Sequence, residues 1–283
     1  MVKIFSPKQQ NPNFLSNKLI GIDEQKKTLE AFCQFVWSQD WQEQSKTLHF
    51  MSTILLYGPP GTGKTSLLKE IANNFEINGI KYYRESLDLL VDKELGETSK
   101  AIKELFDQII EQGKCGKKVF LQLDDIDSVL SSRFMSNESS GVRRGVNTFL
   151  IQLDELLQIE FEYTPIIAAT TNMFSNLDSA IKRRFSLKIK VDPILNRMQL
   201  EDLLSPIEKI IGSQLQINYD LIESITKEKK LTPYDIILVM QKLFLNSLIG
   251  NEIKFQQFTD ELNSSESSKV SFEKQEQAYS LLQ

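Results

Sequence analysis

The chain has 283 residues, of which 41% are hydrophobic and 25% are charged, and its formal net charge is −5. This length and composition are typical of one or two globular domains, and the mildly acidic balance gives no global basic field that would favour nucleic acid. Two cysteines and one histidine exclude a disulfide framework, a Cys/His zinc cluster and a Ser-His-Asp hydrolase. No apolar run reaches the roughly 18 residues of a membrane span and no signal peptide is present, so we expect a cytoplasmic location and no membrane contact.

Apolar runs and helical spacing alternate along the first part of the chain. After an extended, turn-rich leader, helical spacing of apolar residues begins near Glu24. Buried strands are predicted over residues 54–57, 119–123, 165–170 and 187–191. Helices are predicted over residues 65–75, 98–111 and 142–157, with a polar, mobile loop over residues 131–141. This alternation indicates an α/β fold with a parallel sheet that is covered by helices on both faces.

The strand signal stops after Pro193. Only helical spacing follows, and the helices of this small all-helical unit are predicted over residues 197–211, 220–226 and 233–248. The polar, serine-rich end of the chain predicts a disordered segment or a docking tail. The predicted organisation is a leader over residues 1–17, an α/β domain over 18–192, a helical domain over 193–262 and a polar tail over 263–283.

The turn after the first predicted strand matches the phosphate-binding pattern G-x-x-x-x-G-K-[ST] over residues 58–65. Glycines let backbone N–H groups approach a phosphate without Cβ clashes, and the next helix directs its positive dipole end at the anion. We expect Lys64 to reach the β- and γ-phosphates of ATP and the Thr65 hydroxyl to bind Mg²⁺. The expected nucleotide contacts are Pro59, Pro60, Gly61, Thr62, Gly63, Lys64, Thr65 and Ser66. The predicted fold is therefore a P-loop NTPase domain followed by a helical lid domain.

Two carboxylates, Asp124 and Asp125, follow the predicted strand over residues 119–123. We expect this strand to lie beside the strand that precedes the phosphate cradle. Asp124 would then hold Mg²⁺ through water, and Asp125 would polarise the water that attacks the γ-phosphate. Glutamate is the usual residue in the second role, and aspartate is one methylene shorter, so the pattern also allows slow hydrolysis.

In this order, the motifs resemble the AAA+ ATPases over residues 18–250, and they are most similar to the AAA clade that includes katanin and spastin. Ile20, Gly21 and Ile22 resemble the segment that packs on adenine in that family, which implies nucleotide contacts for Gly21 and Ile22. Asn172 matches sensor one, whose polar side chain hydrogen-bonds the attacking water and the γ-phosphate.

The resemblance also implies assembly with other copies of the chain. Arg183 and Arg184 match the segment that supplies arginine fingers to the neighbouring subunit, and the sequence does not distinguish between them. A guanidinium suits the charge that develops on the γ-phosphoryl group, and it stays protonated. Because the fingers act in trans, one subunit cannot complete its own site. The resemblance therefore implies a homo-oligomeric ring, a hexamer in that family.

Three departures from the family pattern bear on function. Asp125 stands where glutamate is usual, and Glu94 stands where substrate-threading relatives usually carry an aromatic residue in the central pore. Residues 231–235, Leu-Thr-Pro-Tyr-Asp, replace the sensor-two segment of many relatives, without a clear sensor-two arginine.

Three functions are compatible with these observations. The first is an ATP-driven remodeller of a protein partner. The second is a slow nucleotide switch that controls a separate effector protein, which Asp125 and Glu94 favour. The third is a nucleic-acid loader or remodeller, which is opposed by the net negative segment over residues 92–97.

Overall fold

A computed structural model describes residues 19–281, apart from residues 77–78, 87–96, 128–139, 212–214 and 251–252. The strands are β1 (Thr53–Tyr57), β2 (Lys81–Ser86), β3 (Val119–Asp124), β4 (Ile166–Thr171) and β5 (Leu187–Lys190). The helices that accompany the strands are α1 (Asp23–Val36), α2 (Trp41–Leu48), α3 (Lys64–Glu76), α5 (Glu97–Lys114), α7 (Ser140–Gln158) and α8 (Ser179–Arg183), with a 3-10 turn, η2 (Phe174–Asn176). The later helices are α9 (Arg197–Ile211), α10 (Tyr219–Lys229), α11 (Pro233–Leu248), α12 (Phe255–Ser264) and α13 (Ser268–Leu281).

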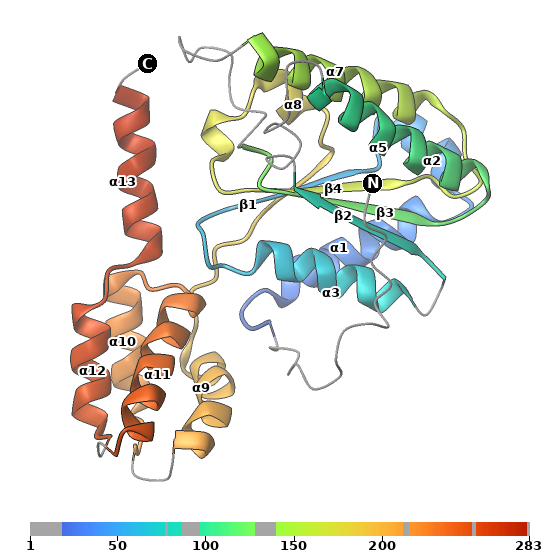
Figure 1. Ribbon diagram of the computed structural model, residues 1–283. Helices are drawn as coiled ribbons and strands as arrows, with labels where there is room; N and C mark the ends of the chain where they lie inside the picture. The colour runs from blue at the N-terminus through green and yellow to red at the C-terminus, as the bar shows by residue number, and fades with distance from the viewer. Residues whose placement is uncertain are drawn as a thin grey trace. The chain divides into compact units, whose positions relative to one another are not determined.

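The five strands form one parallel sheet in the order β2-β3-β4-β1-β5 (Figure 1). All four predicted strands are present, and β2 is an additional edge strand that the sequence pattern did not predict. The expectation that the strand ending at Asp124 lies beside the cradle strand is wrong, because β4 pairs with both β1 and β3 and lies between them. The carboxyl ends of β1, β3 and β4 nevertheless share one edge of the sheet, because the strands are parallel.

Helices cover both faces of this sheet, with α5 and α7 over one face and α1 and α3 over the other (Figure 1). Strands β3 and β4 are buried along their whole length, as expected of a parallel sheet between two helical layers. Phe106 of α5 and Phe149 of α7 are fully buried, with ring centroids 5.6 Å apart in an edge-to-face arrangement. Both rings belong to the apolar core that packs these helices against the sheet.

The later helices pack around an apolar core of their own. The fully buried members of this core include Leu200, Leu204, Ile222, Ile236 and Phe258. Helix α11 begins with a capping box, in which the Asp235 N–H donates to Thr232 Oγ1 and the Thr232 N–H donates to the Asp235 carboxylate at 2.8 Å. This reciprocal pair satisfies two backbone donors that the start of a helix otherwise leaves unpaired.

The polar end of the chain is helical in its described part. The first turn of α13 is attached to the helical core, since Ser268 donates from its N–H and its hydroxyl to the Asp235 carboxylate. Lys269 donates to both oxygens of Asp192 at 2.7 Å. Disorder is therefore the wrong expectation for residues 263–281, because these polar side chains have partners within the fold, while the docking alternative stays a prediction.

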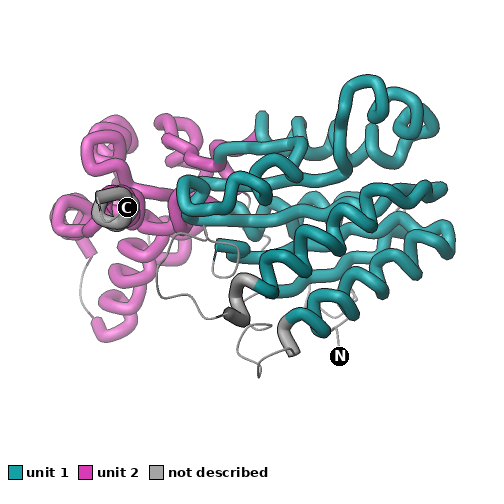
Figure 2. The backbone as a smooth tube through the Cα atoms, turned by 90° about the horizontal axis from the view of Figure 1, so that it is seen from above, with its two compact units in different colours: residues 1–15, 24–58, 64–190 teal, residues 16–23, 59–63, 191–283 magenta. Residues whose placement is uncertain are grey.

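The chain forms two compact units (Figure 2). Of the described residues, one unit contains residues 24–58 and 64–190, and the other contains residues 19–23, 59–63 and 191–281. The predicted domain boundaries stay predictions. The predicted leader over residues 1–17, the pore position Glu94 and most of the predicted loop over residues 131–141 lie outside the described residues.

The two cysteines differ sharply in their surroundings. Cys33 lies on the buried face of α1, and burial raises the pKa of its thiol well above the ordinary value. Cys115 directly follows α5 and is exposed. None of the helices in the described residues combines the length and apolar character that a membrane span requires.

Candidate functional site

The turn between β1 and α3 has the backbone that a phosphate cradle needs. Gly61 and Gly63 have φ angles of 75° and 92°, in the left-handed region that favours glycine. The buried Thr62 hydroxyl donates to the Pro59 carbonyl at 2.9 Å and closes the turn. Helix α3 begins at Lys64, so its unpaired N–H groups are directed back toward the turn. The predicted phosphate contacts all lie in this turn or in the first turn of α3, and their contact with a nucleotide stays a prediction.

Lys64 connects the cradle to the edge of the sheet. Its ammonium group is buried and donates to the Gly58 carbonyl at 2.9 Å and to Asn172 Oδ1 at 2.7 Å. Burial lowers the pKa of Lys64 to about 8, although the charges of Asp125 and Asp127 act in the opposite direction. A lysine in these surroundings gains stabilisation from an anion that reaches its ammonium group.

Asp124 ends the buried strand β3 and has three hydrogen-bond donors. Arg84 Nε donates to its Oδ2 at 2.6 Å. Gln122 Nε2 and the Thr170 hydroxyl donate to its Oδ1 at 2.8 Å and 3.3 Å. These three bonds hold the buried carboxylate in one orientation, which suits its predicted role toward Mg²⁺.

Asp125 and Asn172 are brought together at the ends of β3 and β4. Asn172 Nδ2 donates to Asp125 Oδ1 at 3.1 Å, so one amide bridges Lys64 and Asp125. The Asp125 backbone has a φ of 47° and donates its N–H to Thr170 Oγ1 at 3.1 Å. Aspartate is tolerated in this left-handed region better than a longer acidic residue, which gives a local reason for the departure from glutamate.

A further acid, Asp127, fixes the sensor position and was not singled out from the sequence. Its Oδ1 accepts from the Thr171 hydroxyl at 2.6 Å and from the Asn172 N–H at 3.2 Å. The third acid in the run Asp124-Asp125-Ile126-Asp127 is the signal that could have identified it. Asp127 therefore holds the backbone from which the Asn172 side chain extends.

These residues fit a nucleoside triphosphate with Mg²⁺. A buried ammonium, two left-handed glycines and a helix N-terminus are donors for phosphate oxygens. Thr65 and Asp124 offer the hard oxygen ligands that Mg²⁺ prefers, one at the start of α3 and one at the end of β3. When bound, Mg²⁺ would neutralise charge on the phosphate oxygens.

The predicted adenine segment lies in the same compact unit as residues 59–63. Gly21 has a φ of 80°, and a Cβ placed on it would lie 2.7 Å from Leu195 Cδ2, so only glycine fits without a shift. Ile22 is buried, and its Cδ1 would lie 3.9 Å from a Cβ placed on Gly63. Ile22 thus lies beside the cradle, while its contact with adenine stays a prediction.

The departure over residues 231–235 lies next to Gly61, which belongs to the same compact unit. A Cβ placed on Gly61 would lie 2.9 Å from Tyr234 Cβ and 3.1 Å from Thr232 Oγ1. The start of α11 therefore presents a hydroxyl and an aromatic ring to Gly61 in place of a sensor-two arginine. This close approach requires glycine at position 61 in addition to its backbone angle.

The two predicted finger residues at the end of α8 have different surroundings. Arg184 forms a bidentate pair with Asp154, at 2.7 Å from Nε and 2.6 Å from Nη2, and its Nη1 donates to the Ala180 carbonyl at 3.0 Å. The hydrogen bond that Arg184 donates to Asp154 raises the pKa of the guanidinium, so its charge is permanent. Arg183 is exposed, and within the described residues its guanidinium has no hydrogen-bond or ion-pair partner. Their roles as fingers stay predictions.

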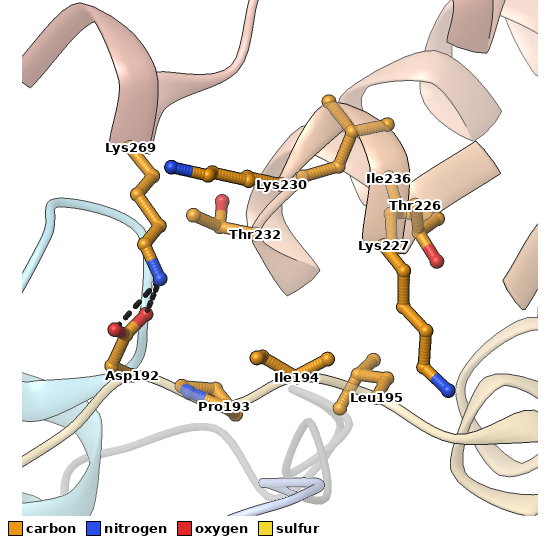
Figure 3. A pocket seen from close by; sticks show the side chains of 11 residues that line it. Asp192, Pro193, Ile194, Leu195, Thr226, Lys227, Lys230, Thr232, Ile236 and Lys269 are labelled. Carbon is orange, nitrogen blue, oxygen red and sulfur yellow. Dashed lines mark hydrogen bonds and ion pairs between the residues drawn. The ribbon is translucent and has the colours of Figure 1, made fainter. Parts of the chain in front are cut away.

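A cavity of about 220 Å³ lies among residues of the helical unit (Figure 3). Its wall is formed by the linker over residues 192–195, the ends of α10 and α11, and Lys269 of α13, whose ammonium points at Asp192. The other two lysines of the wall, Lys227 and Lys230, are paired with Glu223 and Glu273. Because every lysine has a carboxylate partner, the cavity does not resemble a phosphate site.

Comparison with known proteins gives one family model and several relatives. Residues 54–193 match the model described as "ATPase family associated with various cellular activities (AAA)". The chain is 35% identical over 156 residues to a probable spastin homolog of Brugia malayi, which covers 55% of this chain and 33% of that protein. It is 39% identical over 138 residues to vacuolar protein sorting-associated protein 4B of Mus musculus, which covers 49% of this chain and 29% of that protein. The chain thus spans about a third of the length of these curated relatives.

A solved structure extends the likeness to nearly the whole chain. A chain of the HORMA:CdnC:Trip13 complex of E. coli MS115-1 superposes with a TM-score of 0.73 and covers 91% of this chain and 94% of that chain. The two sequences are 22% identical, so this likeness shows the fold alone.

Proposed function

We propose that this chain, whose residues 54–193 form an AAA ATPase domain, hydrolyses ATP with Mg²⁺, assembles into a homo-oligomeric ring and remodels or regulates a protein partner. The observation that carries the proposal is the hydrogen-bonded series Lys64, Asn172 and Asp125, which joins the cradle to the ends of β4 and β3. A hexamer, a protein partner and a cytoplasmic location are supported by the family resemblance.

The chemistry follows from the places of these side chains. Lys64 would stabilise charge on the phosphate oxygens, and Asn172 would orient the attacking water. The water oxygen forms a bond to the γ-phosphorus while the bond to the leaving oxygen of ADP breaks, and Asp125 accepts the proton that the water releases. Buried charge at Lys64 is favourable in this step, because a partly desolvated site weakens screening.

Assembly is supported by the two arginines. Arg184 is engaged with Asp154 in its own subunit, whereas Arg183 is exposed at the end of α8. An exposed guanidinium on the surface can reach a phosphate that a neighbouring copy holds. We therefore assign the finger that acts in trans to Arg183 and a local structural role to Arg184.

A slow nucleotide switch is the second candidate, and the geometry of Asp125 favours it. The short carboxylate is bonded to Asn172, and its backbone is in the left-handed region. A general base must reach the attacking water before its pKa matters, so a short side chain in a fixed orientation favours slow turnover.

The test is a complementation assay on the full chain. Arg183→Ala and Asp125→Asn should each abolish ATP hydrolysis, which is measured at increasing protein concentration. An equal mixture of the two variants should recover roughly a quarter of the wild-type rate, because a defective finger and a defective base then occur in different subunits of one ring. No recovery, with a wild-type rate per subunit that is independent of concentration, would refute trans-acting assembly. A wild-type chain that binds ATP and hydrolyses it far more slowly than it binds would favour the switch.

A further inference from the structure

The end of β2 contributes a cation to the predicted magnesium position. Arg84 Nε donates to Asp124 Oδ2 at 2.6 Å, and the two side chains form an ion pair. The side chain of Arg84 keeps 45% of its surface exposed, whereas that of Asp124 keeps 7%. The Arg84 side chain can therefore move into solvent, whereas the Asp124 side chain stays buried in the sheet.

The hydrogen bonds of Asp124 leave little room for further ligands. A carboxylate offers about two acceptor positions on each oxygen. Oδ1 already accepts from Gln122 and Thr170, and Oδ2 accepts from Arg84. A water of a metal shell must therefore share Oδ2 with Arg84 or take its place.

Buried polar neighbours fix the orientation of the Asp124 carboxylate, so that it cannot rotate away from Arg84. Residues two apart on one strand share a face, and the register places Arg84 opposite Gln122 and Tyr82 opposite Phe120. The Tyr82 hydroxyl donates to Gln122 Oε1 at 2.8 Å, so the Gln122 amide group is oriented with its N–H₂ toward Asp124. Gln122 is fully buried, so loss of its bonds would leave polar atoms unpaired.

We propose that Arg84 competes with Mg²⁺ for the Asp124 carboxylate, so that this ion pair must be displaced or shared whenever the magnesium form of the nucleotide is bound. The inference rests on the proposed function, since it concerns the same nucleotide site. Two cations near one carboxylate repel each other, and the repulsion is only partly screened beside a buried group. Arg84 thus raises the Mg²⁺ concentration that the chain needs and stabilises the chain before the nucleotide binds.

The alternative role for Arg84 is that of a positioning residue, which would hold Asp124 in the orientation that favours the metal. The two roles predict opposite effects of a neutral side chain. Competition predicts tighter Mg²⁺ binding after the charge is removed, and positioning predicts weaker binding.

The experiment uses the full chain and a fluorescent ADP analogue, whose affinity is measured as Mg²⁺ is titrated from excess EDTA. Arg84→Gln keeps an N–H donor but removes the charge, and Arg84→Met keeps the aliphatic stem as a second neutral variant. The matched control is Arg84→Lys, which keeps the charge. Competition predicts that half-saturation by Mg²⁺ falls about tenfold in both neutral variants and changes by less than about twofold in Arg84→Lys. An unchanged or higher requirement for Mg²⁺ in the neutral variants overturns the inference.

Thermal unfolding gives a readout that does not depend on catalysis. In EDTA without nucleotide, Arg84→Gln should unfold at a lower temperature than the wild-type chain, because the buried Asp124 carboxylate loses its ion pair. Addition of Mg²⁺ and ADP should raise the unfolding temperature of this variant by more than that of the wild-type chain. Equal increases in both proteins contradict competition. A wild-type chain that binds no nucleotide at any Mg²⁺ concentration refutes the proposed function and this inference together, whereas normal binding without a shift in the variants refutes only the inference.

Discussion

Replacement of Arg184 by alanine should destabilise the α/β unit, whereas replacement of its neighbour Arg183 should not. Arg184 forms two charge-assisted hydrogen bonds to Asp154 and one to the Ala180 carbonyl. The side chains of Arg184 and Asp154 keep 27% and 41% of their surface exposed, so solvent screens their pair. Arg183 is exposed on the same helix and serves as the matched control.

The magnitude follows from these contacts. A partly exposed pair with bidentate geometry contributes about 1 kcal/mol to the free energy of unfolding, at the upper end for surface pairs. The bond to the Ala180 carbonyl adds about 0.5–1 kcal/mol. Arg184→Ala should therefore lose about 1–2 kcal/mol, which lowers the unfolding temperature of a domain of this size by about 3–6 °C. Arg183→Ala should change that temperature by less than about 1 °C.

The assay is thermal unfolding followed by circular dichroism, without nucleotide, alongside the ATPase rate of each variant. A double-mutant cycle with Asp154→Ala should show a coupling energy of about 1 kcal/mol between Arg184 and Asp154. The reasoning fails if Arg183→Ala lowers the unfolding temperature as much as Arg184→Ala does. It also fails if Arg184→Ala abolishes hydrolysis without any change in stability, because Arg184 would then be the finger.

Three further predictions concern Lys64, Asp125 and the core. Because burial lowers the pKa of Lys64 to about 8, the nucleotide-free protein loses this charge as the pH rises through that value, and ADP affinity measured by fluorescence should fall about tenfold by pH ~9. Unfolded chains keep the lysine proton to higher pH and so bind more protons there, so the contribution of Lys64 to stability should rise above pH ~8. Lys64→Arg should remove the pH dependence of both affinity and stability, because arginine stays charged. A flat affinity profile in the wild-type chain would contradict the burial argument. Asp125→Glu should increase the single-turnover rate of ATP hydrolysis several-fold, because the longer side chain reaches the attacking water. It should also reduce the free energy of unfolding by about 1 kcal/mol, because glutamate suits a φ of 47° less well than aspartate does. An unchanged rate would show that the reach of the carboxylate is not limiting. Phe149→Ala should lower the free energy of unfolding, measured in urea, by about 3–5 kcal/mol, because its side chain is fully buried. Ile151 is exposed on the same helix, so Ile151→Ala should change this free energy by less than about 0.5 kcal/mol. Similar losses in both variants would refute the assigned core.

The sequence pattern predicts the central part of the fold well, because buried parallel strands are continuous apolar runs. Strands β1, β3 and β4 fall within about a residue of their predicted bounds, helices α9 and α11 match theirs, and α7 begins two residues earlier than predicted. Strand β2 was missed because its sequence, Lys81 to Ser86, mixes charged and aromatic residues, as an edge strand can. Helix α13 was missed because its polar composition resembles a tail, and its order depends on contacts of Ser268 and Lys269 with residues distant in sequence.

The candidate site was predictable only where one motif carries the chemistry. Lys64 and Asp124 could be named from local patterns, and Asn172 from the family resemblance. The parallel strand order then brings all three to one edge of the sheet. The partners of these residues could not be named in that way. Arg84 lies 40 positions from Asp124, and Asp154 lies 30 positions from Arg184, so both pairs arise only from the packing of separate elements.

Because Cys115 is exposed and Cys33 is buried, this chain can be labelled at a single site without any substitution. A maleimide dye reacts with the thiolate, so at neutral pH it should attach to the exposed Cys115 and leave the buried Cys33 unmodified. Two samples that carry donor and acceptor dyes would then report the mixing of subunits by energy transfer. The stoichiometry and lifetime of an assembly could thus be followed in solution on an otherwise unaltered protein.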